Sequence, residues 1–228
     1  MQTIGFIGLG TMGGNMAARY LAAGYAVYGE ARNRDAAQWL IDQGLRWVET
    51  PREVAQAAEI VMTSLPNDDV VESVASGPDG LLAGLGEGKI WADLSTITPA
   101  VSRRLSARVG EQRPGAQMLD TPVSGSVPQV QSGTLTIMVG GNERAYRRAE
   151  PVLRVLGTPE YVGESGQGSY SSSRSTSASP CRCSRSPKPA ARRAQRDRSS
   201  PGRGDHDRKL DRFTDAQGPR SAGAGQAR

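Results

Sequence analysis

Three glycines near the start of the chain restrict its fold more than any other feature. The stretch TIGFIGLG is a short, β-rich apolar run that ends in glycine, as expected of a buried parallel strand. Gly8, Gly10 and Gly13 form a G-x-G-x-x-G pattern, and the helix-like segment TMGGNMAARYLAAG follows, with Gly24 as its stop signal. A strand, a glycine turn and a helix in this order open a βαβ unit.

Strands and helices continue to alternate over about the first 165 residues. After the opening strand, we predict strands over 25–30, 59–65, 89–95, 116–124, 133–141 and 159–164. The further predicted helices cover 33–44, 50–58, 67–75, 98–109 and 142–157. In the helix over 50–58, Thr50 is the predicted N-cap and Glu53 completes a capping box. This alternation predicts an α/β fold of the Rossmann type, with a doubly wound, mostly parallel sheet of about six to eight strands.

Charge is divided unevenly along the chain. Residues 171–228 hold 14 Lys and Arg against 5 Asp and Glu, whereas residues 1–170 hold 14 against 18. The net charge of +5 therefore comes from the second region, and the mildly acidic first region gives no reason to expect a specific nucleic-acid partner.

Other sequence features narrow the class of protein further. There is no apolar run of about 18 residues, so we expect no membrane span, and the first residues do not resemble a signal peptide. The only cysteines, Cys181 and Cys183, are too closely spaced for a metal knuckle, so no metal site is predicted. We expect a cytoplasmic protein.

The glycine pattern predicts a dinucleotide-binding site, although a glycine-rich turn without a ligand is the alternative. The first glycine permits a tight turn, the second leaves room for a pyrophosphate and the third lets the helix pack on the strand. Free N–H groups at the helix start then face the phosphates. The predicted cofactor-binding residues of this segment are Gly8, Leu9, Gly10, Thr11, Met12 and Gly13.

The end of the second predicted strand bears on the choice between NAD and NADP. Glu30 is an acid at the position that binds the ribose hydroxyls of NAD, whereas Arg32 and Arg34 are placed to receive the 2′-phosphate of NADP. The alternative for both arginines is a solvated loop. We favour NADP over NAD, with Arg32 as a cofactor-binding residue.

Five motifs along the chain resemble those of the β-hydroxyacid dehydrogenases. In order, they are GFIGLGTMGGNMA, SLPNDDVV, DLSTITP, DTPVSGSVPQVQSGTLTIMVGG and GESGQG, and they span roughly residues 2–169. The family includes 3-hydroxyisobutyrate dehydrogenase, tartronate semialdehyde reductase and the related 6-phosphogluconate dehydrogenases. The resemblance implies that Leu65 and Pro66 line the cofactor and that Ser95 and Thr96 lie near its nicotinamide.

The same resemblance implies a substrate loop. Ser124 and Gly125 would hold the substrate carboxylate through a hydroxyl and a backbone N–H, and Ser126 stands where the family usually has a second glycine. We expect a serine there to crowd the loop. Without the surrounding motif, Ser124 would be an ordinary turn serine.

The reaction that the resemblance implies is reversible oxidation of a short 3-hydroxy acid by NAD(P). In the family, a Lys acts as general acid–base and an Asn orients the substrate hydroxyl, both from a G-x-G-x-x-x-K-x-x-x-N segment that opens an all-α second domain. Gly166 and Gly168 match this segment, but Ser172 stands at the Lys position and Thr176 at the Asn position. No catalytic residue is therefore assigned. We expect a catalytically impaired chain that lacks the second domain needed for family-type homo-oligomerisation.

The composition changes sharply at about the same place. Beyond Tyr170 the only large aliphatic or aromatic residues are Leu210 and Phe213, which cannot form a packed core. We therefore divide the chain into a dinucleotide-binding domain over 1–169 and a tail over 170–228 that we expect to be disordered. The tail is either a natural Arg- and Ser-rich segment or a second domain read in the wrong frame.

Codon arithmetic favours the second explanation. Residues 168–185 can be written with codons that, after insertion of one base behind the Ser169 codon, regroup as Gly-Ser followed by LLKLAINISLAVQMLA. This is an apolar helix with Lys and Asn at the family spacing. Residues 205–217, with their first base dropped, give ITTGSSIGSPML, which resembles the second domain of the family. Two other functions are open for the chain as a whole. One is a redox-inert NAD(P)-binding remnant, and the other, less favoured, is a nucleic-acid-binding protein that acts through its basic tail.

Overall fold

The structure is a computed structural model that describes residues 2–175. Thr176 and the rest of the predicted tail lie outside the described residues. The prediction that the tail is disordered therefore concerns residues that the structure does not describe. Residues 170–175 were also assigned to the tail, but they continue a helix that begins before them, and the predicted boundary between 169 and 170 falls within it.

The described residues form one nine-stranded sheet with strand order β3-β2-β1-β4-β5-β6-β8-β7, and β9 pairs with β8. Five parallel pairings carry the first six strands, β8 and β9 are also parallel, and only β6–β8 and β7–β8 are antiparallel. The strands are β1 Thr3–Ile7, β2 Ala26–Glu30, β3 Arg46–Trp47, β4 Ile60–Thr63, β5 Ile90–Asp93, β6 Gln117–Asp120, β7 Val123–Ser124, β8 Leu135–Gly141 and β9 Gly157–Gly163. The Rossmann-type fold predicted from the sequence is confirmed.

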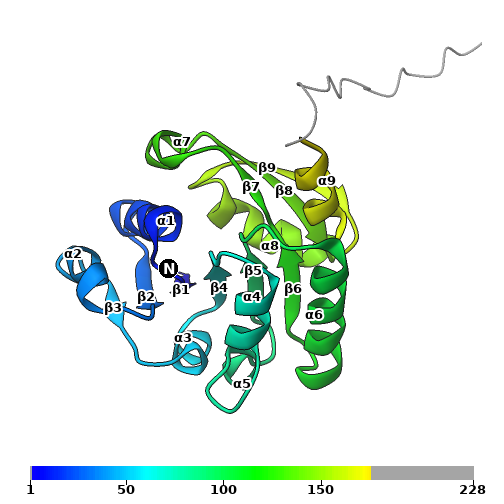
Figure 1. The fold of residues 1–228 in the computed structure, drawn as a ribbon, viewed down its shortest axis with the longest axis horizontal. Coiled ribbons are helices and arrows are strands. Elements are labelled where there is room, and N and C mark those ends of the chain that lie inside the picture. The colour runs from blue at the N-terminus through cyan, green and yellow to red at the C-terminus, as the bar shows by residue number, and fades with distance from the viewer. Residues whose placement is uncertain (1, 176–228) are drawn as a thin grey trace, which may run out of the picture. The chain divides into compact units, whose positions relative to one another are not determined.

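Helices cover both faces of the sheet (Figure 1). They are α1 Thr11–Ala22, α2 Gln38–Ile41, α3 Pro51–Ala57, α4 Asp68–Ala75, α5 Leu81–Gly84, α6 Pro99–Gln112, α7 Val127–Ser132, α8 Glu143–Leu153 and α9 Gln167–Ser175, with a 3₁₀ turn at Asp35–Ala37. Two apolar cores result: one packs residues of α1, α2 and α8 against the sheet, and the other packs α3, α4, α5 and α6. Such a doubly wound arrangement is what alternating strands and helices dictate.

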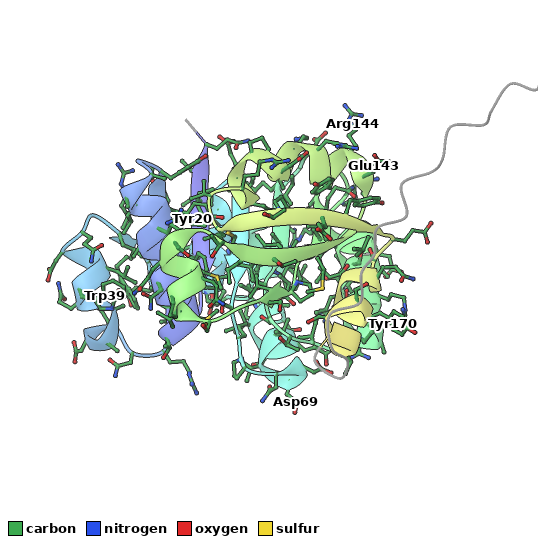
Figure 2. The ribbon with its side chains drawn as sticks, turned by 90° about the horizontal axis from the view of Figure 1, so that it is seen from above. Tyr20, Trp39, Asp69, Glu143, Arg144 and Tyr170 are labelled. Carbon is green, nitrogen blue, oxygen red and sulfur yellow. The ribbon has the colours of Figure 1, made fainter. Side chains whose placement is uncertain are left out.

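Burial of the side chains follows this layering. Figure 2 labels Tyr20 of α1, Trp39 of α2 and Tyr170 of α9. Tyr20 is fully buried, and its hydroxyl donates to the carbonyl of Val152 in α8. Trp39 and Tyr170 are 42% and 47% exposed.

Several local predictions differ from the structure. The helix predicted over 33–44 is only a 3₁₀ turn followed by the single turn of α2, and neither β3 nor α5 nor α7 was expected. Thr50 caps α3 by accepting from the N–H of Glu53, but Glu53 reaches back to the N–H of Glu49 and not to Thr50, so the reciprocal capping box is not formed. The elements α2, β3, α5 and α7 have too few residues to give a periodic sequence signal.

Candidate nucleotide-binding site

The glycine turn between β1 and α1 has the geometry that its sequence demands. Gly8 has φ of +90°, a region that favours glycine, and its N–H donates to the carbonyl of Glu30 at 3.1 Å. A Cβ at Gly13 would lie 2.0 Å from the Gly8 carbonyl oxygen and 3.1 Å from the Phe6 ring, so only glycine lets α1 start this close to β1. A Cβ at Gly10, in contrast, would meet nothing within 4 Å.

The first turn of α1 is open to a ligand. Gly10 is the N-cap, no side chain among the described residues caps the helix, and its first turn holds no acid. Thr11 is exposed and Met12 half-buried at this end. Backbone N–H groups and the helix dipole therefore favour an anion here.

A cavity of about 290 Å³ lies beside this helix end. It occupies the carboxyl-terminal ends of β1, β2 and β4, where the strand order reverses and where open α/β sheets bind ligands. Six predicted cofactor residues line it: Gly8, Leu9, Gly10, Arg32, Leu65 and Pro66. The remaining predicted residues are Thr11, Met12 and Gly13 in the adjoining helix turn and the exposed Thr96, which are not among its lining residues.

The charged residues at the β2 end of the cavity separate into two groups. Glu30 and Arg32 line the cavity, and burial raises the pKa of the half-buried Glu30. Arg34 faces elsewhere, because its guanidinium lies 3.5 Å from the carboxylate of Glu49 and 5.7 Å from the centre of the Trp47 ring. No ion pair within residues 2–175 involves the exposed Arg32.

The opposite wall of the cavity is the loop after β4, and a buried polar network supports it. Asp93, at the end of β5, accepts the hydroxyl proton of Thr63 at 2.6 Å and the N–H of Ser95 at 3.1 Å on its Oδ1 atom. The Ser95 hydroxyl oxygen in turn accepts the N–H of Leu65 at 2.9 Å. Trp91 donates its indole N–H to Thr63 at 2.9 Å.

Asp93 is fully buried, and its other oxygen, Oδ2, has no hydrogen-bond partner in the structure. Burial, together with the charge of Asp120, raises the pKa of Asp93 to about 6, although the hydrogen bonds from Ser95 and Thr63 act in the opposite direction. The sequence analysis did not single out Asp93 or Thr63. The signal available was an acid that directly follows the apolar run IWA at the end of a predicted strand.

A second buried acid, Asp120, holds the start of α9. Its Oδ1 accepts the N–H of Gly166 at 3.0 Å and its Oδ2 accepts the N–H of Ser169 at 2.9 Å. A Cβ at Gly168 would lie 2.6 Å from the Asp120 carbonyl oxygen, so glycine is needed for this approach. The helix places the buried Ser172 one turn after Gly168.

The predicted substrate loop lies at the surface, between β7 and α7. Ser124, Gly125 and Ser126 are all exposed, and Gly125 has φ of +144°. The backbone N–H and the hydroxyl of Ser126 both donate to the side-chain oxygen of Gln129, so this hydroxyl is engaged within α7. Ser126 is thereby the cap of a helix that the sequence analysis did not predict.

Neither a membrane helix nor a metal cluster is found among residues 2–175. None of the helices described there is long and apolar enough to cross a bilayer. Nor does any group of three or more His, Cys, Asp or Glu side chains in this range lie close enough to hold a metal ion.

Comparison with known proteins identifies the family. The family model described as the NAD binding domain of 6-phosphogluconate dehydrogenase matches residues 3–166. The chain belongs to the β-hydroxyacid dehydrogenase family. A relative from Arabidopsis thaliana, named a probable mitochondrial 3-hydroxyisobutyrate dehydrogenase, is 43% identical over 179 residues, which are 74% of this chain and 52% of the relative.

Two solved structures are similar to this chain. The 3-hydroxyisobutyrate dehydrogenase of Mycobacterium tuberculosis, solved with L-serine, is 34% identical with a TM-score of 0.70 and covers 75% of this chain and 58% of its own. Psf3, solved in complex with NADP⁺ and 2-OPP, is 35% identical with a TM-score of 0.71 and covers 75% and 60%. The chain thus spans between half and three fifths of the length of these three proteins.

Proposed function

We propose that this chain is the dinucleotide-binding part of an NAD(P)-dependent dehydrogenase of the 3-hydroxyisobutyrate type. The observation that carries the proposal is the uncapped start of α1 beside the cavity at the switch point of the sheet. Backbone N–H groups there suit a pyrophosphate, and the lack of a Cβ at Gly10 leaves room for it. Names of relatives such as 3-hydroxyisobutyrate dehydrogenase support a short 3-hydroxy acid as the substrate.

We further propose that the preferred cofactor is NADP and that Arg32 binds its 2′-phosphate. Arg32 lines the cavity beyond β2, whereas Arg34 is held by Glu49. The Psf3 complex with NADP⁺ supports the same cofactor class. Arg32→Ala should weaken NADP⁺ binding about tenfold or more relative to NAD⁺, because a guanidinium–phosphate contact is lost. Arg34→Ala, the matched control, should change the NADP⁺/NAD⁺ ratio little.

The chemistry of the proposed reaction is transfer of a hydride from the carbinol carbon to nicotinamide, which the bound cofactor supplies. The hydroxyl proton must leave as the hydride departs, and a general base is required to accept it. Ser172 occupies the family's Lys position, and a serine hydroxyl is too weak a base for this task. Loss of the base alone costs on the order of 10²–10⁴ in rate, so we infer an impaired enzyme.

We propose that the residues from 170 onward are read out of frame, so that the domain over 1–169 is followed by a non-native tail over 170–228. The support is the regrouping of residues 168–185 into a helix with Lys and Asn at the family spacing. The nucleotide sequence across residues 166–190 tests this proposal. Codons that do not regroup to restore Lys at position 172 would exclude it.

A redox-inert nucleotide-binding protein is the second candidate, and Ser172 is the observation that favours it. Titration of the 228-residue chain with NADPH, followed by nicotinamide fluorescence with ADP-ribose as competitor, tests the binding step. A turnover assay with 3-hydroxyisobutyrate and NADP⁺ tests catalysis. Binding with turnover supports an active dehydrogenase, binding without turnover supports the inert protein, and a folded chain that does not bind contradicts both.

A further inference from the structure

The loop Ser64–Pro66 forms the wall of the nucleotide cavity that faces the glycine turn. The two segments pack tightly: a Cβ at Gly8 would lie 2.4 Å from the Ser64 carbonyl oxygen and 2.9 Å from the Leu65 side chain. A Cβ at Gly13 would also lie 3.1 Å from the Ser64 Cβ. A shift of this loop therefore changes both the width of the cavity and the support of the glycine turn.

Hydrogen bonds from residues at the ends of the neighbouring strands hold this loop in place. Leu65 donates its N–H to the Ser95 hydroxyl oxygen, and the Ser95 backbone N–H is held by Asp93. Asp93 also binds the hydroxyl of Thr63, two residues before Leu65. The Oδ1 atom of Asp93 thus binds both Thr63, the last residue of β4, and Ser95, the residue that accepts the N–H of Leu65.

The placement of this carboxyl is costly, which indicates that its hydrogen bonds matter. The side chain is 1% exposed, and its Oδ2 atom has no hydrogen-bond partner in the structure. A buried polar atom without a partner costs about 1–3 kcal/mol. A Leu or Val at this position would avoid that cost but would leave the Ser95 N–H and the Thr63 hydroxyl without their acceptor.

We propose that Asp93 is a positioning residue of the nucleotide site, which acts through Thr63 and Ser95 to hold the Leu65–Pro66 wall against the glycine turn. The inference rests on the proposed binding of a dinucleotide in this cavity. Asp93 does not line the cavity, so any effect on affinity has to pass through the loop.

The test compares three variants of the full chain by two readouts. Asp93→Ala removes the acceptor, Asp93→Asn keeps an oxygen acceptor of the same shape, and Val109→Ala lowers stability in α6 without touching the network. The first readout is the exchange rate of the Leu65 amide by NMR. The second is the affinity for NADPH.

Asp93→Ala should speed Leu65 exchange and weaken NADPH binding about tenfold, since loosening a supporting shell typically costs tenfold or more. Asp93→Asn should restore both to within about threefold of the wild type, and Val109→Ala should leave both unchanged. A merely structural role would give Asp93→Ala and Val109→Ala the same profile, which would overturn the inference.

Failure of the inference can be told from failure of the proposed function. If the wild type binds NADPH and Asp93→Ala binds it equally well, only the positioning role is wrong. If the wild type does not bind NADPH, the proposed function falls, and Leu65 exchange still decides whether Asp93 holds the loop. Unchanged exchange in Asp93→Ala overturns the inference in either case.

Discussion

Asp93 and Asp120 stand opposite each other at the carboxyl ends of the parallel strands β5 and β6, and both side chains are buried. Each ties a different segment to the sheet: Asp93 supports the loop after β4, and Asp120 accepts two N–H groups at the start of α9. Burial in the first place, and to a smaller extent the charge of Asp120, favours retention of a proton on Asp93.

Stability should therefore depend on pH through Asp93. Its folded-state pKa of about 6 lies above the ordinary pKa of 3.8 for an aspartate, so the folded state keeps a proton that the unfolded chain releases. The resulting stabilisation is full below about pH 4 and is lost as the pH rises through 6. Relative to Asp93→Asn, the wild type should lose about 2–2.5 kcal/mol of unfolding free energy between pH 4 and 7, as measured by urea denaturation.

The matched control for that measurement is Asp69→Asn, an exposed acid in the first turn of α4 (Figure 2). Removing its charge should shift unfolding free energy by less than about 1 kcal/mol, with little change over the same pH range. If the difference in unfolding free energy between the wild type and Asp93→Asn does not change between pH 4 and 7, the folded protein holds Asp93 ionised over this range. The account of this acid would then be wrong.

Asp120→Ala should loosen the start of α9. The change removes the acceptors of the Gly166 and Ser169 N–H groups, and hydrogen bonds to a charged acceptor contribute about 1.5–3 kcal/mol each. Hydrogen exchange followed by mass spectrometry should show faster exchange over residues 166–175. Asn67→Ala, which removes the cap of α4, should speed exchange there and leave α9 protected.

How far the sequence predicts this protein depends on how regular each part is. The glycine turn and the long elements were predictable, because Gly8 and Gly13 occupy positions where a Cβ clashes or φ is positive. The two-residue β3 and the short α5 and α7 leave no periodic pattern, and tertiary contacts decide them.

The candidate site shows the same division. Residues on the glycine turn and the loop after β4 were predictable from motifs, and most of them line the cavity. The roles of Asp93 and Asp120 were not predictable from the sequence, because they depend on strand register. The register brings these two acids together at the carboxyl ends of β5 and β6. That Arg34 pairs with Glu49, leaving Arg32 at the cavity, likewise requires the three-dimensional arrangement.

Gly13→Ala should destabilise the fold. Its Cβ would lie 2.0 Å from the Gly8 carbonyl oxygen, and such overpacking costs about 1–3 kcal/mol. Gly110→Ala is the matched control, because Gly110 lies in α6 with nothing within 4 Å of an added Cβ. The control should gain up to about 1 kcal/mol from helix propensity, as read from chemical denaturation. Equal behaviour of the two variants would mean that α1 does not approach β1 this closely.

The most direct test of the central claim is calorimetric titration of NADP⁺ into the wild type and into Gly10→Val. A Cβ at this position meets nothing within 4 Å and the backbone is extended, so the variant should stay folded while its side chain fills the proposed pyrophosphate position. We predict saturable one-site binding by the wild type and a loss of at least about tenfold in the variant. A folded wild type that takes up neither NADP⁺ nor NAD⁺, or equal affinity of the two proteins, would contradict the account.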